Sequence, residues 1–539
     1  MNVLTRLLEH AATTPDRVAI IDRDGRQISY AGLAREGARF AALLHSQGVR
    51  RGDTVLVLVP MSIELYATLA GVFALGAVVM VLDPSAGLAH LERCCALRSP
   101  QALIGVPLAH LLSLAVPSLR RVALRVCAKG WWPGAVPWGR GSGSVELGEE
   151  VNTDAPALLT FTSGTSGTPK AALRTHGLLL AQLAALETLL APEEGDVDLA
   201  TLAIVALANL ATGVTTVIPD ASLRRPASLN ARPVLEQIAR HGVTRTAASP
   251  ALLERLADVA SKQRLSLPGL KRIYSGGGPV FPRVLHKLAR VAPNARLIGV
   301  YGSTEAEPIA HIAFQDLSAS DLEAVRGGQG LLVGPPVEAI DLRIMPNRAG
   351  ELLEFADLES FEAVTLGAGK IGEIVVSGPH VLPGYLGGVG DGETKFRVNG
   401  RVWHRTGDAG HLDAQGRLWL AGRAGARILD ARGELYPFST ECAALEVPGV
   451  RRCALLGHRG GRVLCVGWEK GRADKKETEA LLERLAWAHV DRIVTVKSLP
   501  MDARHNAKVD LGRLRKLLTQ DKLHGAADGG ISVWKKTPP

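Results

Sequence analysis

Cysteine is scarce in this sequence, and its spacing excludes the common cysteine-based sites. Only six cysteines occur among 539 residues, and no two of them form a C-x-x-C pair. Zinc sites and redox motifs use that close spacing, and disulfide frameworks are typical of short secreted chains. We therefore expect ordinary reduced thiols in a cytoplasmic protein.

The sequence also lacks a secretory signal, and its longest uncharged run does not predict a membrane span. Residues 1–16 are polar and amphipathic rather than continuously apolar. The run from Leu65 to Leu82 has 18 residues without a charge, which only reaches the threshold for a transmembrane helix. Its first half is rich in alanine, its second half is rich in valine, and Gly71 and Gly76 interrupt it. We expect a buried helix followed by a buried strand.

A basic block studded with aromatic residues is absent, although the chain as a whole is basic. The net charge is +9, but lysine and arginine are spread along the chain. Proteins that bind nucleic acid concentrate their basic residues on one face or segment. We expect a solvated basic surface, a site for an anionic nucleotide and no nucleic-acid partner. With 47% apolar side chains, the chain can bury a large core and should form more than one domain.

A loop rich in glycine and hydroxyl residues is the most informative feature that the sequence does contain. Phe161-Thr-Ser-Gly-Thr-Ser-Gly-Thr-Pro-Lys170 follows the apolar run Ala155 to Leu159, which predicts a buried strand. Glycines let backbone N–H groups approach an anion, hydroxyls add donors, and the lysine adds positive charge. The loop therefore predicts a phosphate cradle, although the Walker A spacing is absent. The cradle residues are Thr162, Ser163, Gly164, Thr165, Ser166, Gly167 and Lys170.

Later motifs supply further groups suited to a nucleotide. Tyr301-Gly-Ser-Thr-Glu305 follows the strand-like segment Arg296 to Val300. A carboxylate at a strand end suits Mg²⁺, which takes one or two protein carboxylates together with substrate phosphates. Arg405-Thr-Gly-Asp408 places an acid in a tight turn suited to ribose hydroxyls, Gly422-Arg423 adds a cation, and Arg504-His-Asn-Ala-Lys508 adds a lysine. Each motif is weak alone, but in this order they predict a nucleoside triphosphate site.

The order and spacing of these motifs resemble the acyl-adenylate-forming superfamily. That superfamily includes acyl-CoA synthetases, peptide-synthetase adenylation domains and luciferases. The resemblance covers roughly Leu4 to Leu517. Further segments that carry it are Pro15-Asp-Arg-Val-Ala19, Ile28-Ser-Tyr30, Ala74-Leu-Gly-Ala-Val78, Gly276-Gly-Gly-Pro279, Gly372-Glu-Ile and Gly384-Tyr385.

The resemblance implies an α/β fold in two parts. We expect a large layered N-terminal domain of mixed sheets and helices, residues 1–421, and a small mobile α+β C-terminal domain, residues 422–524. The alternation of helix and strand patterns agrees with a layered α/β body. The tail, residues 525–539, is small and polar, and we expect it to be disordered. Residues 128–148 are rich in glycine, proline and tryptophan, and should form an exposed loop whose tryptophans pack on the protein's own surface.

The resemblance also implies ATP and Mg²⁺ as cofactors and assigns the phosphate side of the site. The loop from Thr162 to Lys170 would bind the β- and γ-phosphates. Glu305 would bind Mg²⁺, and Thr304 would contact the α-phosphate. Lys508 would bridge the carboxylate of the substrate and the α-phosphate during adenylation.

The nucleoside side of the site follows from the same resemblance. Asp408 and Arg423 would bind the ribose. Tyr301 and Gly277 would flank the adenine.

Two departures from the family pattern concern the step after adenylation. Many acyl-CoA and aryl-CoA ligases carry an aromatic–histidine pair in the segment that corresponds to residues 203–213, which contain neither residue type here. The hinge position, which is usually charged, is Gly425, and glycine leaves the backbone free to rotate.

Within the superfamily, several segments resemble the olefin-pathway β-lactone synthetases of bacteria. They are Asp196-Val-Asp-Leu199, Gly213-Val-Thr-Thr-Val-Ile-Pro-Asp220, Ser249-Pro-Ala-Leu252 and Asp502-Ala-Arg-His-Asn-Ala-Lys508. This branch adenylates a long-chain β-hydroxy acid, whose own hydroxyl then displaces AMP and closes a four-membered lactone without CoA. An intramolecular nucleophile has a high effective concentration, which helps to offset the ring strain. A Phe-Asp-Pro-like element of that branch is replaced here by Ala208-Asn-Leu210.

Three functions stay open. The first is a β-lactone synthetase for long-chain β-hydroxy acids, with other enzymes of a hydrocarbon or lactone pathway as candidate partners. The second is a fatty acyl-CoA ligase, or an acyl-AMP ligase for a carrier-protein thiol, so CoA is an alternative cofactor that we do not favour. The third is a non-catalytic nucleotide-binding protein, against which the intact Lys508, Glu305 and Asp408 argue. In the first two, the apolar run Leu199 to Ala211 would line a pocket for the alkyl chain, although an ordinary core is compatible with it.

Overall fold

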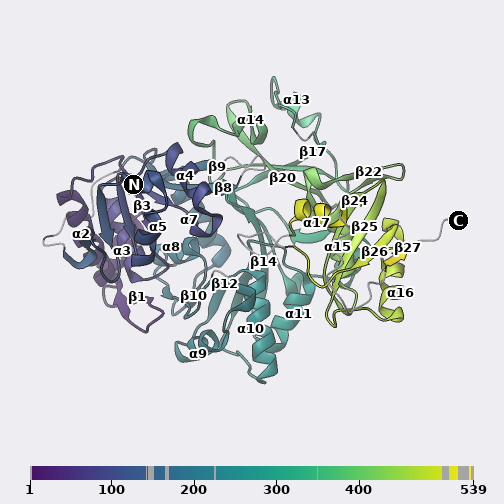
Figure 1. Cartoon of the computed structure of the whole chain (residues 1–539), viewed down its shortest axis with the longest axis horizontal. Helices are drawn as coiled ribbons and strands as arrows, with labels where there is room; N and C mark the ends of the chain where they lie inside the picture. Colours follow the sequence, from purple (N-terminus) through teal and green to yellow (C-terminus); the bar gives the residue numbers. More distant parts are fainter. Residues whose placement is uncertain are drawn as a thin grey trace.

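Two large sheets alternate with three layers of helices in the first part of the chain (Figure 1). The computed structural model describes residues 3–140, 143, 151–163, 169–223, 226–348, 350–500, 509–519 and 533–535. The eight-stranded sheet has the order β15 (Ala306–Ala313), β14 (Arg296–Ser303), β13 (Arg272–Ser275), β12 (Arg245–Ala248), β10 (Val197–Ala200), β11 (Thr215–Val217), β1 (Val18–Ile21) and β2 (Gln27–Ser29). The seven-stranded sheet has the order β7 (Val136–Pro137), β6 (Leu124–Cys127), β5 (Ala102–Gly105), β3 (Thr54–Leu58), β4 (Val78–Val81), β8 (Pro156–Ser163) and β9 (Pro169–Thr175).

Strand β3 illustrates why its sheet is covered on both faces. Val55 and Val57 pack into the core between the two sheets, whereas Leu56 and Leu58 belong to the core on the outer face. Successive side chains of a strand point to opposite faces, so a sheet with helices on both faces needs apolar residues at every position. This layered arrangement confirms the α/β class that the sequence predicted.

The helices of the layered part fall into three sets according to the core they contribute to. The layer between the sheets contains α2 (Tyr30–Ser46), α3 (Ile63–Ala74), α7 (His176–Leu190) and α8 (Ala203–Ala211), with α1 (Thr5–Thr13) packed on α2. The outer face of the seven-stranded sheet carries α4 (Leu88–Leu97), α5 (Pro107–Ser113) and α6 (Pro117–Arg120). The outer face of the eight-stranded sheet carries α9 (Arg232–Arg240), α10 (Pro250–Lys262) and α11 (Pro282–Val291).

The uncharged run between Leu65 and Leu82 forms a helix and a strand, as its composition predicted. It lies within α3 and β4, and Gly76 turns the chain between them with φ +63°. Ser62 caps α3 by accepting a hydrogen bond from the backbone N–H of Leu65 at 3.3 Å. Among the described residues, no helix is both long and apolar enough to cross a membrane.

The rest of the chain forms a mostly antiparallel sheet and a separate C-terminal sheet. The former has the order β16 (Leu331–Gly334), β21 (Leu418–Arg423), β20 (Arg401–Leu412), β18 (Gly372–Ser377) and β17 (Asp341–Met345), and β19 (Lys395–Val398) pairs with β20. The C-terminal sheet has the order β24 (Val450–His458), β25 (Gly461–Trp468), β26 (Arg492–Thr495) and β27 (Val533–Lys535). A hairpin, β22 (Ile428–Asp430) and β23 (Gly433–Leu435), lies between the two sheets in sequence.

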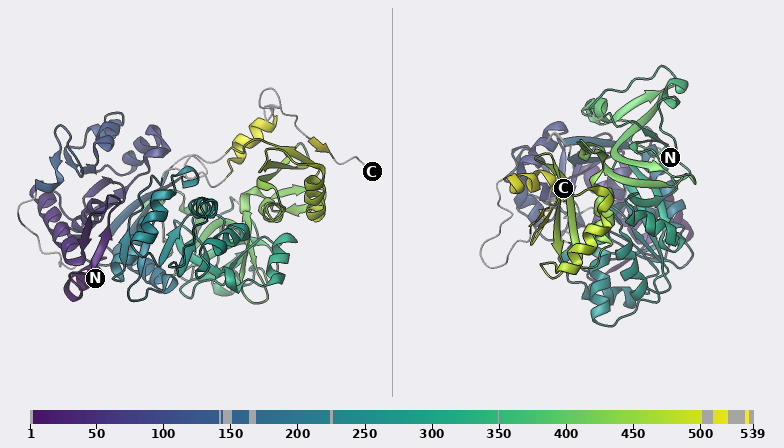
Figure 2. Two further views of the ribbon diagram at one scale, coloured as in Figure 1. Left: turned by 90° about the horizontal axis from the view of Figure 1, so that it is seen from below. Right: turned by 90° about the vertical axis from the view of Figure 1, so that its right-hand side faces the viewer.

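Short helices complete both of these parts. Those of the middle part are α12 (Ala319–Arg326), α13 (Leu358–Glu362) and α14 (Asp391–Thr394). Those of the C-terminal part are α15 (Pro437–Leu445), α16 (Lys475–Arg484) and α17 (Leu511–Thr519), which gather with the C-terminal sheet at one end of the molecule (Figure 2).

The large N-terminal part and the small C-terminal part agree with the predicted fold class. The boundary near residue 422 and the mobility of the C-terminal part stay predictions. Three residues of the predicted disordered tail, 533–535, form β27 and pair with β26. The rest of that tail lies outside the described residues.

The tryptophans between residues 128 and 148 behave in two ways. The ring of Trp138 stacks on that of Phe40 with centroids 5.6 Å apart, and the ring of Trp132 stacks on that of His110 at 5.9 Å. These two pack on the protein's own surface, as the sequence predicted. Trp131 is 70% exposed and does not.

Candidate functional site

Strands β8 and β9 position the ends of the predicted phosphate loop. The strands are antiparallel neighbours, and Thr162 lies opposite Lys170 in their register. The loop therefore leaves and re-enters the sheet at one edge. Of the predicted cradle, Ser163 ends β8, and Gly164, Thr165, Ser166 and Gly167 lie outside the described residues.

Lys170 is buried and points its ammonium group at an acidic helix. Its Nζ lies 3.2 Å from Oε2 of Glu393, donates to the carbonyl of Gly390 at 3.5 Å, and lies 5.5 Å from the centre of the Tyr385 ring. A Cβ atom on Gly390 would come within 2.4 Å of Lys170 Cε, and that residue also has φ +91°. The positive φ favours glycine at this position, and a side chain would also have to displace the end of the lysine.

Glu305 lies in the turn between β14 and β15 and is held as a carboxylate. The hydroxyl of Tyr385 donates a hydrogen bond to its Oε1 at 2.7 Å. Burial acts to raise the pKa of Glu305, but the neighbouring His404, the Tyr385 hydroxyl and the Lys395 ammonium together outweigh it, and the pKa is lowered. Burial and the nearby Lys395 ammonium lower the pKa of His404, and the Glu305 carboxylate acts to raise it. The predicted magnesium ligand is therefore ionised and oriented.

Arg174 connects the phosphate-loop strands to the Glu305 turn. Its Nη1 donates to the hydroxyl of Thr160 at 2.7 Å, and its Nη2 donates to the carbonyl of Thr304 at 2.5 Å. The Thr304 side chain itself remains exposed. Segments that are 130 residues apart in sequence thus meet through one buried guanidinium.

The predicted ribose residues meet where β20 pairs with β21. Asp408 lies opposite Arg423 in the register, and Arg423 Nη1 lies 3.2 Å from Oδ1 of Asp408. The Tyr301 hydroxyl donates to the other oxygen, Oδ2, at 2.9 Å. Burial, together with this carboxylate, raises the pKa of Tyr301 well above its usual value, so the phenol keeps its proton. The structure brings together three of the four residues that were predicted to bind the nucleoside.

Gly277, the fourth, lies in the loop between β13 and α11. Its φ of +75° belongs to the left-handed region that favours glycine. A Cβ atom on the preceding Gly276 would lie 3.2 Å from the carbonyl of Val300, so the loop passes close to the strand that carries Tyr301. The loop therefore belongs to the same site.

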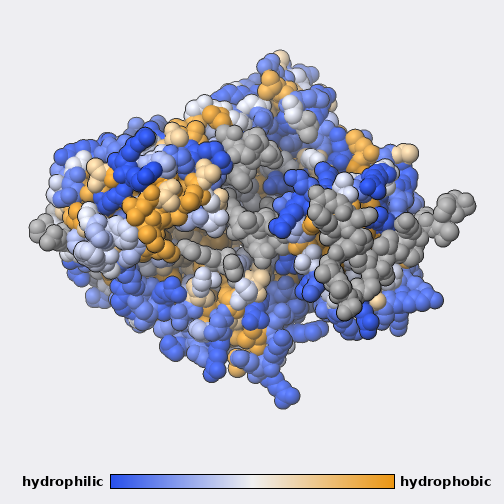
Figure 3. Space-filling view, in the orientation of Figure 1, coloured by the Kyte–Doolittle hydropathy of each residue, from blue (hydrophilic) through white to orange (hydrophobic). Residues whose placement is uncertain are grey.

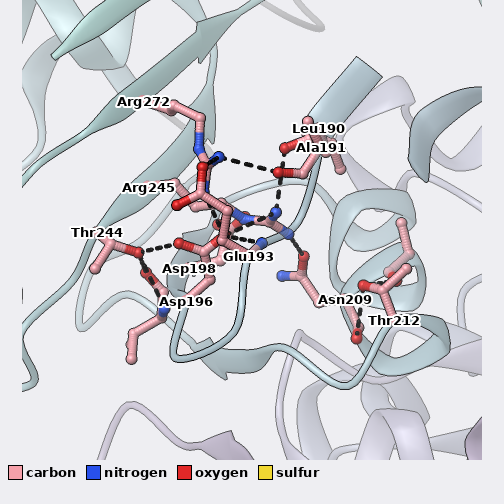
Figure 4. Close-up of polar contacts among 12 residues, drawn as sticks. Leu190, Ala191, Glu193, Asp196, Asp198, Asn209, Thr212, Thr244, Arg245 and Arg272 are labelled. Atoms are coloured by element: carbon pink, nitrogen blue, oxygen red, sulfur yellow. Dashed lines mark hydrogen bonds and ion pairs between the residues drawn. The ribbon is translucent and has the colours of Figure 1, made fainter. Parts of the chain in front are cut away.

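The segment predicted to line an acyl pocket forms the end of β10 and helix α8. A fully buried arginine, Arg245, ties this segment together (Figure 4). Its Nε donates to Oδ2 of Asp198 at 2.8 Å, and its Nη2 donates to Oδ1 of Asn209 at 2.5 Å. Asn209 Nδ2 in turn donates to the hydroxyl of Thr216 at 3.1 Å. Both the oxygen and the nitrogen of the Asn209 side-chain amide therefore form hydrogen bonds within the protein.

Some residues of the site had no predicted role. Arg174, Lys395 and His404 were not singled out, because isolated polar residues within strands show no motif. Tyr385 was noted only as part of a family segment. A signal was available for Arg174, which is a second charged residue four positions after Lys170 in the segment that follows the phosphate loop. Lys508 lies outside the described residues.

The donor set around Glu305 suits a magnesium ion that arrives with phosphate. Within the described part of the chain, no group of three or more His, Cys, Asp or Glu side chains is arranged to hold a metal ion. Mg²⁺ does not require such a group, because it binds one or two carboxylates together with substrate phosphates and water.

These groups define an enzyme of the adenylate-forming class, and comparison with known proteins agrees. Residues 7–386 match the model of the AMP-binding enzyme family, and the chain belongs to that family. The olefin β-lactone synthetase of Stenotrophomonas maltophilia (strain K279a) is 33% identical over 95% of this chain and 97% of its own length.

Solved structures share the fold at lower identity. The amide bond synthetase from Marinactinospora thermotolerans superimposes with a TM-score of 0.78 at 22% identity, over 95% of this chain and 99% of its own. The o-succinylbenzoate coenzyme A synthetase from Bacillus subtilis, solved with ATP and magnesium ion, gives a TM-score of 0.75 at 22% identity, over 95% of this chain and 99% of its own.

Proposed function

We propose that the protein activates a long-chain β-hydroxy fatty acid with ATP and closes the resulting acyl-AMP to a β-lactone. The observation that carries the proposal is the 33% identity, along nearly the whole chain, to a protein named olefin β-lactone synthetase. The ionised Glu305 and the paired Asp408 and Arg423 support the adenylation step.

In the first step, an oxygen of the fatty acid carboxylate attacks the α-phosphorus of ATP. A bond forms between that carboxylate oxygen and the α-phosphorus. The bond from the α-phosphorus to the oxygen that bridges it to the β-phosphorus breaks, and pyrophosphate leaves. Because the reacting groups are all anionic, the site must supply cations and alignment rather than an acid or a base. Lys170 and the loop after β8 would bind the β- and γ-phosphates, Thr304 would contact the α-phosphate, and Lys508 would bridge the two reacting groups.

Mg²⁺ bound at Glu305 would neutralise charge on the phosphates. The Tyr385 hydroxyl holds the carboxylate in place, and the lowered pKa of Glu305 keeps it ionised. Tyr301 orients Asp408 toward the ribose, and Gly277 leaves room beside the adenine.

In the second step, the β-hydroxyl of the substrate attacks its own acyl carbonyl. A carbon–oxygen bond closes the four-membered ring, the acyl–phosphate bond breaks, and the hydroxyl proton leaves with AMP. The intramolecular nucleophile needs no thiol and has a high effective concentration. Asn209, in the segment where many CoA ligases carry an aromatic–histidine pair, is engaged by Arg245 and Thr216. A C-terminal part that rotates at Gly425 would carry Lys508 away between the two steps.

Product analysis by mass spectrometry tests this proposal. Purified protein would be incubated with ATP, Mg²⁺ and a long-chain β-hydroxy acid, with and without CoA, and the Lys508→Ala variant would serve as the inactive control. We expect AMP and a product lighter than the acid by one water in both tubes. A thioester that forms only with CoA would instead assign the protein to the acyl-CoA ligases.

Two other outcomes would separate the remaining alternatives. Acyl-AMP that accumulates in both tubes would indicate a missing acceptor, such as a carrier-protein thiol. No ATP turnover with any acid of the series would favour a non-catalytic nucleotide-binding protein.

A further inference from the structure

Helix α5 exposes a row of leucines on the outer layer of the seven-stranded sheet. Leu108, Leu111 and Leu114, each three positions after the last, are 60%, 53% and 51% exposed. The opposite side of the helix buries Ala109 and His110. A helix that is covered on one face only normally turns polar residues to the other.

Trp131 lies in a loop near the start of this helix. A Cβ atom on Gly130 would lie 3.3 Å from Cγ of Pro107, the first residue of α5, so the loop after β6 runs against the start of the helix. Trp132 stacks on His110 of that helix, while Trp131 is 70% exposed. We refer to Leu108, Leu111, Leu114 and Trp131 as the α5 patch.

The segment that carries the α5 patch has a net positive charge. Between residues 84 and 140 the chain has seven lysine or arginine residues and one acidic residue, Glu92, although the net charge of the whole chain is only +9. Seven basic residues among 57 is close to the chain average of 62 among 539, so the segment is unusual in its lack of acidic residues rather than in its number of basic ones. Arg93, Arg120 and Arg121 are exposed. In the described structure, none of them forms an ion pair.

The arginines lie beside the leucines rather than across the molecule from them. Arg125 donates to the hydroxyl of Ser113, at the end of α5, and to the carbonyls of Leu119 and Arg120. Helix α6, which ends at Arg120, also packs against α4 and α5. The end of α6, with Arg120 and Arg121, therefore lies beside the end of α5, which Leu114 follows.

This surface lies at the same edge of the sheet as the phosphate loop. Strands β5, β3, β4 and β8 are parallel, so their carboxyl ends lie on one edge. Helix α5 begins two residues after β5, and the phosphate loop follows β8. In the space-filling view, an orange apolar area lies over the region of α5 (Figure 3).

We propose that the α5 patch and its arginines dock the protein on an anionic lipid surface. Exposed leucine and tryptophan side chains gain free energy when they enter the boundary between headgroups and acyl chains. Arginines near an anionic bilayer add attraction that salt weakens. The near absence of acidic residues over 57 consecutive positions, 84–140, suits a uniformly negative surface better than the mixed charges of a protein partner.

Vesicle flotation with the full-length protein tests the proposal, and it does not depend on which acid the enzyme activates. The vesicles would contain phosphatidylcholine alone, or equal parts of phosphatidylcholine and phosphatidylglycerol. Three variants would be compared with the wild type: Leu108→Ser/Leu111→Ser/Leu114→Ser, the charge reversal Arg93→Glu/Arg120→Glu/Arg121→Glu, and a matched control of exposed leucines elsewhere, Leu265→Ser/Leu352→Ser/Leu429→Ser.

We expect the wild type and the matched control to float with the anionic vesicles at low salt. Binding by the leucine variant should be at least about tenfold weaker, because three apolar side chains no longer enter the interface. The charge reversal should weaken binding by a similar factor and remove most of the salt dependence. A tryptophan fluorescence shift on binding should be reduced in a Trp131→Phe variant.

Three results would overturn the proposal. The wild type could fail to bind anionic vesicles. The leucine variant could bind as well as the wild type, or the wild type could bind neutral and anionic vesicles equally. If the wild type ignores vesicles while the leucine variant loses a co-purifying protein, the surface serves a protein partner instead. Thermal midpoints of the variants should match that of the wild type, which shows that they are folded.

Discussion

The Tyr301 hydroxyl donates a hydrogen bond to Oδ2 of Asp408 at 2.9 Å, although the two residues are 107 positions apart. Tyr301 lies on β14 of the eight-stranded sheet, and Asp408 lies on β20 of the mostly antiparallel sheet. The other oxygen of the carboxylate, Oδ1, forms the ion pair with Arg423. Two sheets that are far apart in sequence therefore share one carboxylate at the predicted ribose site.

Substitutions at this contact should affect ATP binding by different amounts. We expect Tyr301→Phe to raise the KM for ATP by about threefold to tenfold, because one hydrogen bond that orients the carboxylate is lost. Asp408→Ala should raise it further, because the ligand to the ribose is itself removed. Steady-state pyrophosphate exchange measures both values, and Asp316→Ala, in an exposed ion pair with Arg296, is the matched control. Equal KM values in all four proteins would remove Asp408 from the ribose site.

Glu393 should compete with ATP for the Lys170 ammonium. The Lys170 Nζ lies 3.2 Å from Glu393, whose side chain is 63% exposed. We expect Glu393→Gln to lower the KM for ATP by about twofold to fivefold, because an exposed ion pair contributes up to about 1 kcal/mol. Glu359→Gln, at another exposed glutamate on a short helix, serves as the control. A raised KM in Glu393→Gln would show that the glutamate orients the lysine instead of competing with phosphate.

Breaking the buried pair of Arg245 and Asp198 should be more harmful than removing both charges. Arg245→Met leaves a fully buried carboxylate without its cation, and we expect a loss of about 3–5 kcal/mol of stability. The double variant Arg245→Met/Asp198→Leu should recover part of this loss, because no uncompensated charge remains. Thermal midpoints would be compared with those of Arg232→Met, which breaks the exposed pair with Glu236. A double variant that is less stable than Arg245→Met would contradict this view of the cluster.

Glu441 should make the stability of the C-terminal part depend on pH. Its Oε1 accepts a hydrogen bond from the backbone N–H of Leu455 at 2.9 Å, and burial raises the pKa of its carboxyl from 4.5 to about 7. Between these two pH values the folded state holds a proton that the unfolded state has released, so stability falls as pH rises from 4.5 to 7. We expect a fall of about 2–3 kcal/mol in the wild type.

The Glu441→Gln variant tests this directly. Glutamine can still accept the hydrogen bond from Leu455 but does not ionise, so the thermal midpoint should change less across the same pH range. Glu469→Gln, at an exposed glutamate of the same part of the chain, should keep the wild-type slope. An unchanged slope in Glu441→Gln would show that this carboxyl is ionised in the folded protein.

Local sequence patterns predicted the elements of the fold well. The uncharged run from Leu65 to Leu82 contained its own division into helix and strand, because alanine-rich and valine-rich stretches favour different backbones. The apolar run Ala155 to Leu159 likewise predicted the strand before the phosphate loop, which is β8. Contacts such as the one from Arg174 to Thr304 could not be predicted, because strand β9 and the turn between β14 and β15 become neighbours only when the sheets pack together.

The sequence by itself determined the class of enzyme, since the order of the phosphate loop, Glu305, Asp408 and Arg423 is a one-dimensional signature. Only the tertiary structure decided the electrostatics of these groups. The pKa of Glu305 is lowered because His404, Tyr385 and Lys395 reach it from another segment. Asn209 is held by internal hydrogen bonds because Arg245 is buried against it. Burial and charge are properties of neighbours in space, and the chain brings those neighbours together only when it folds.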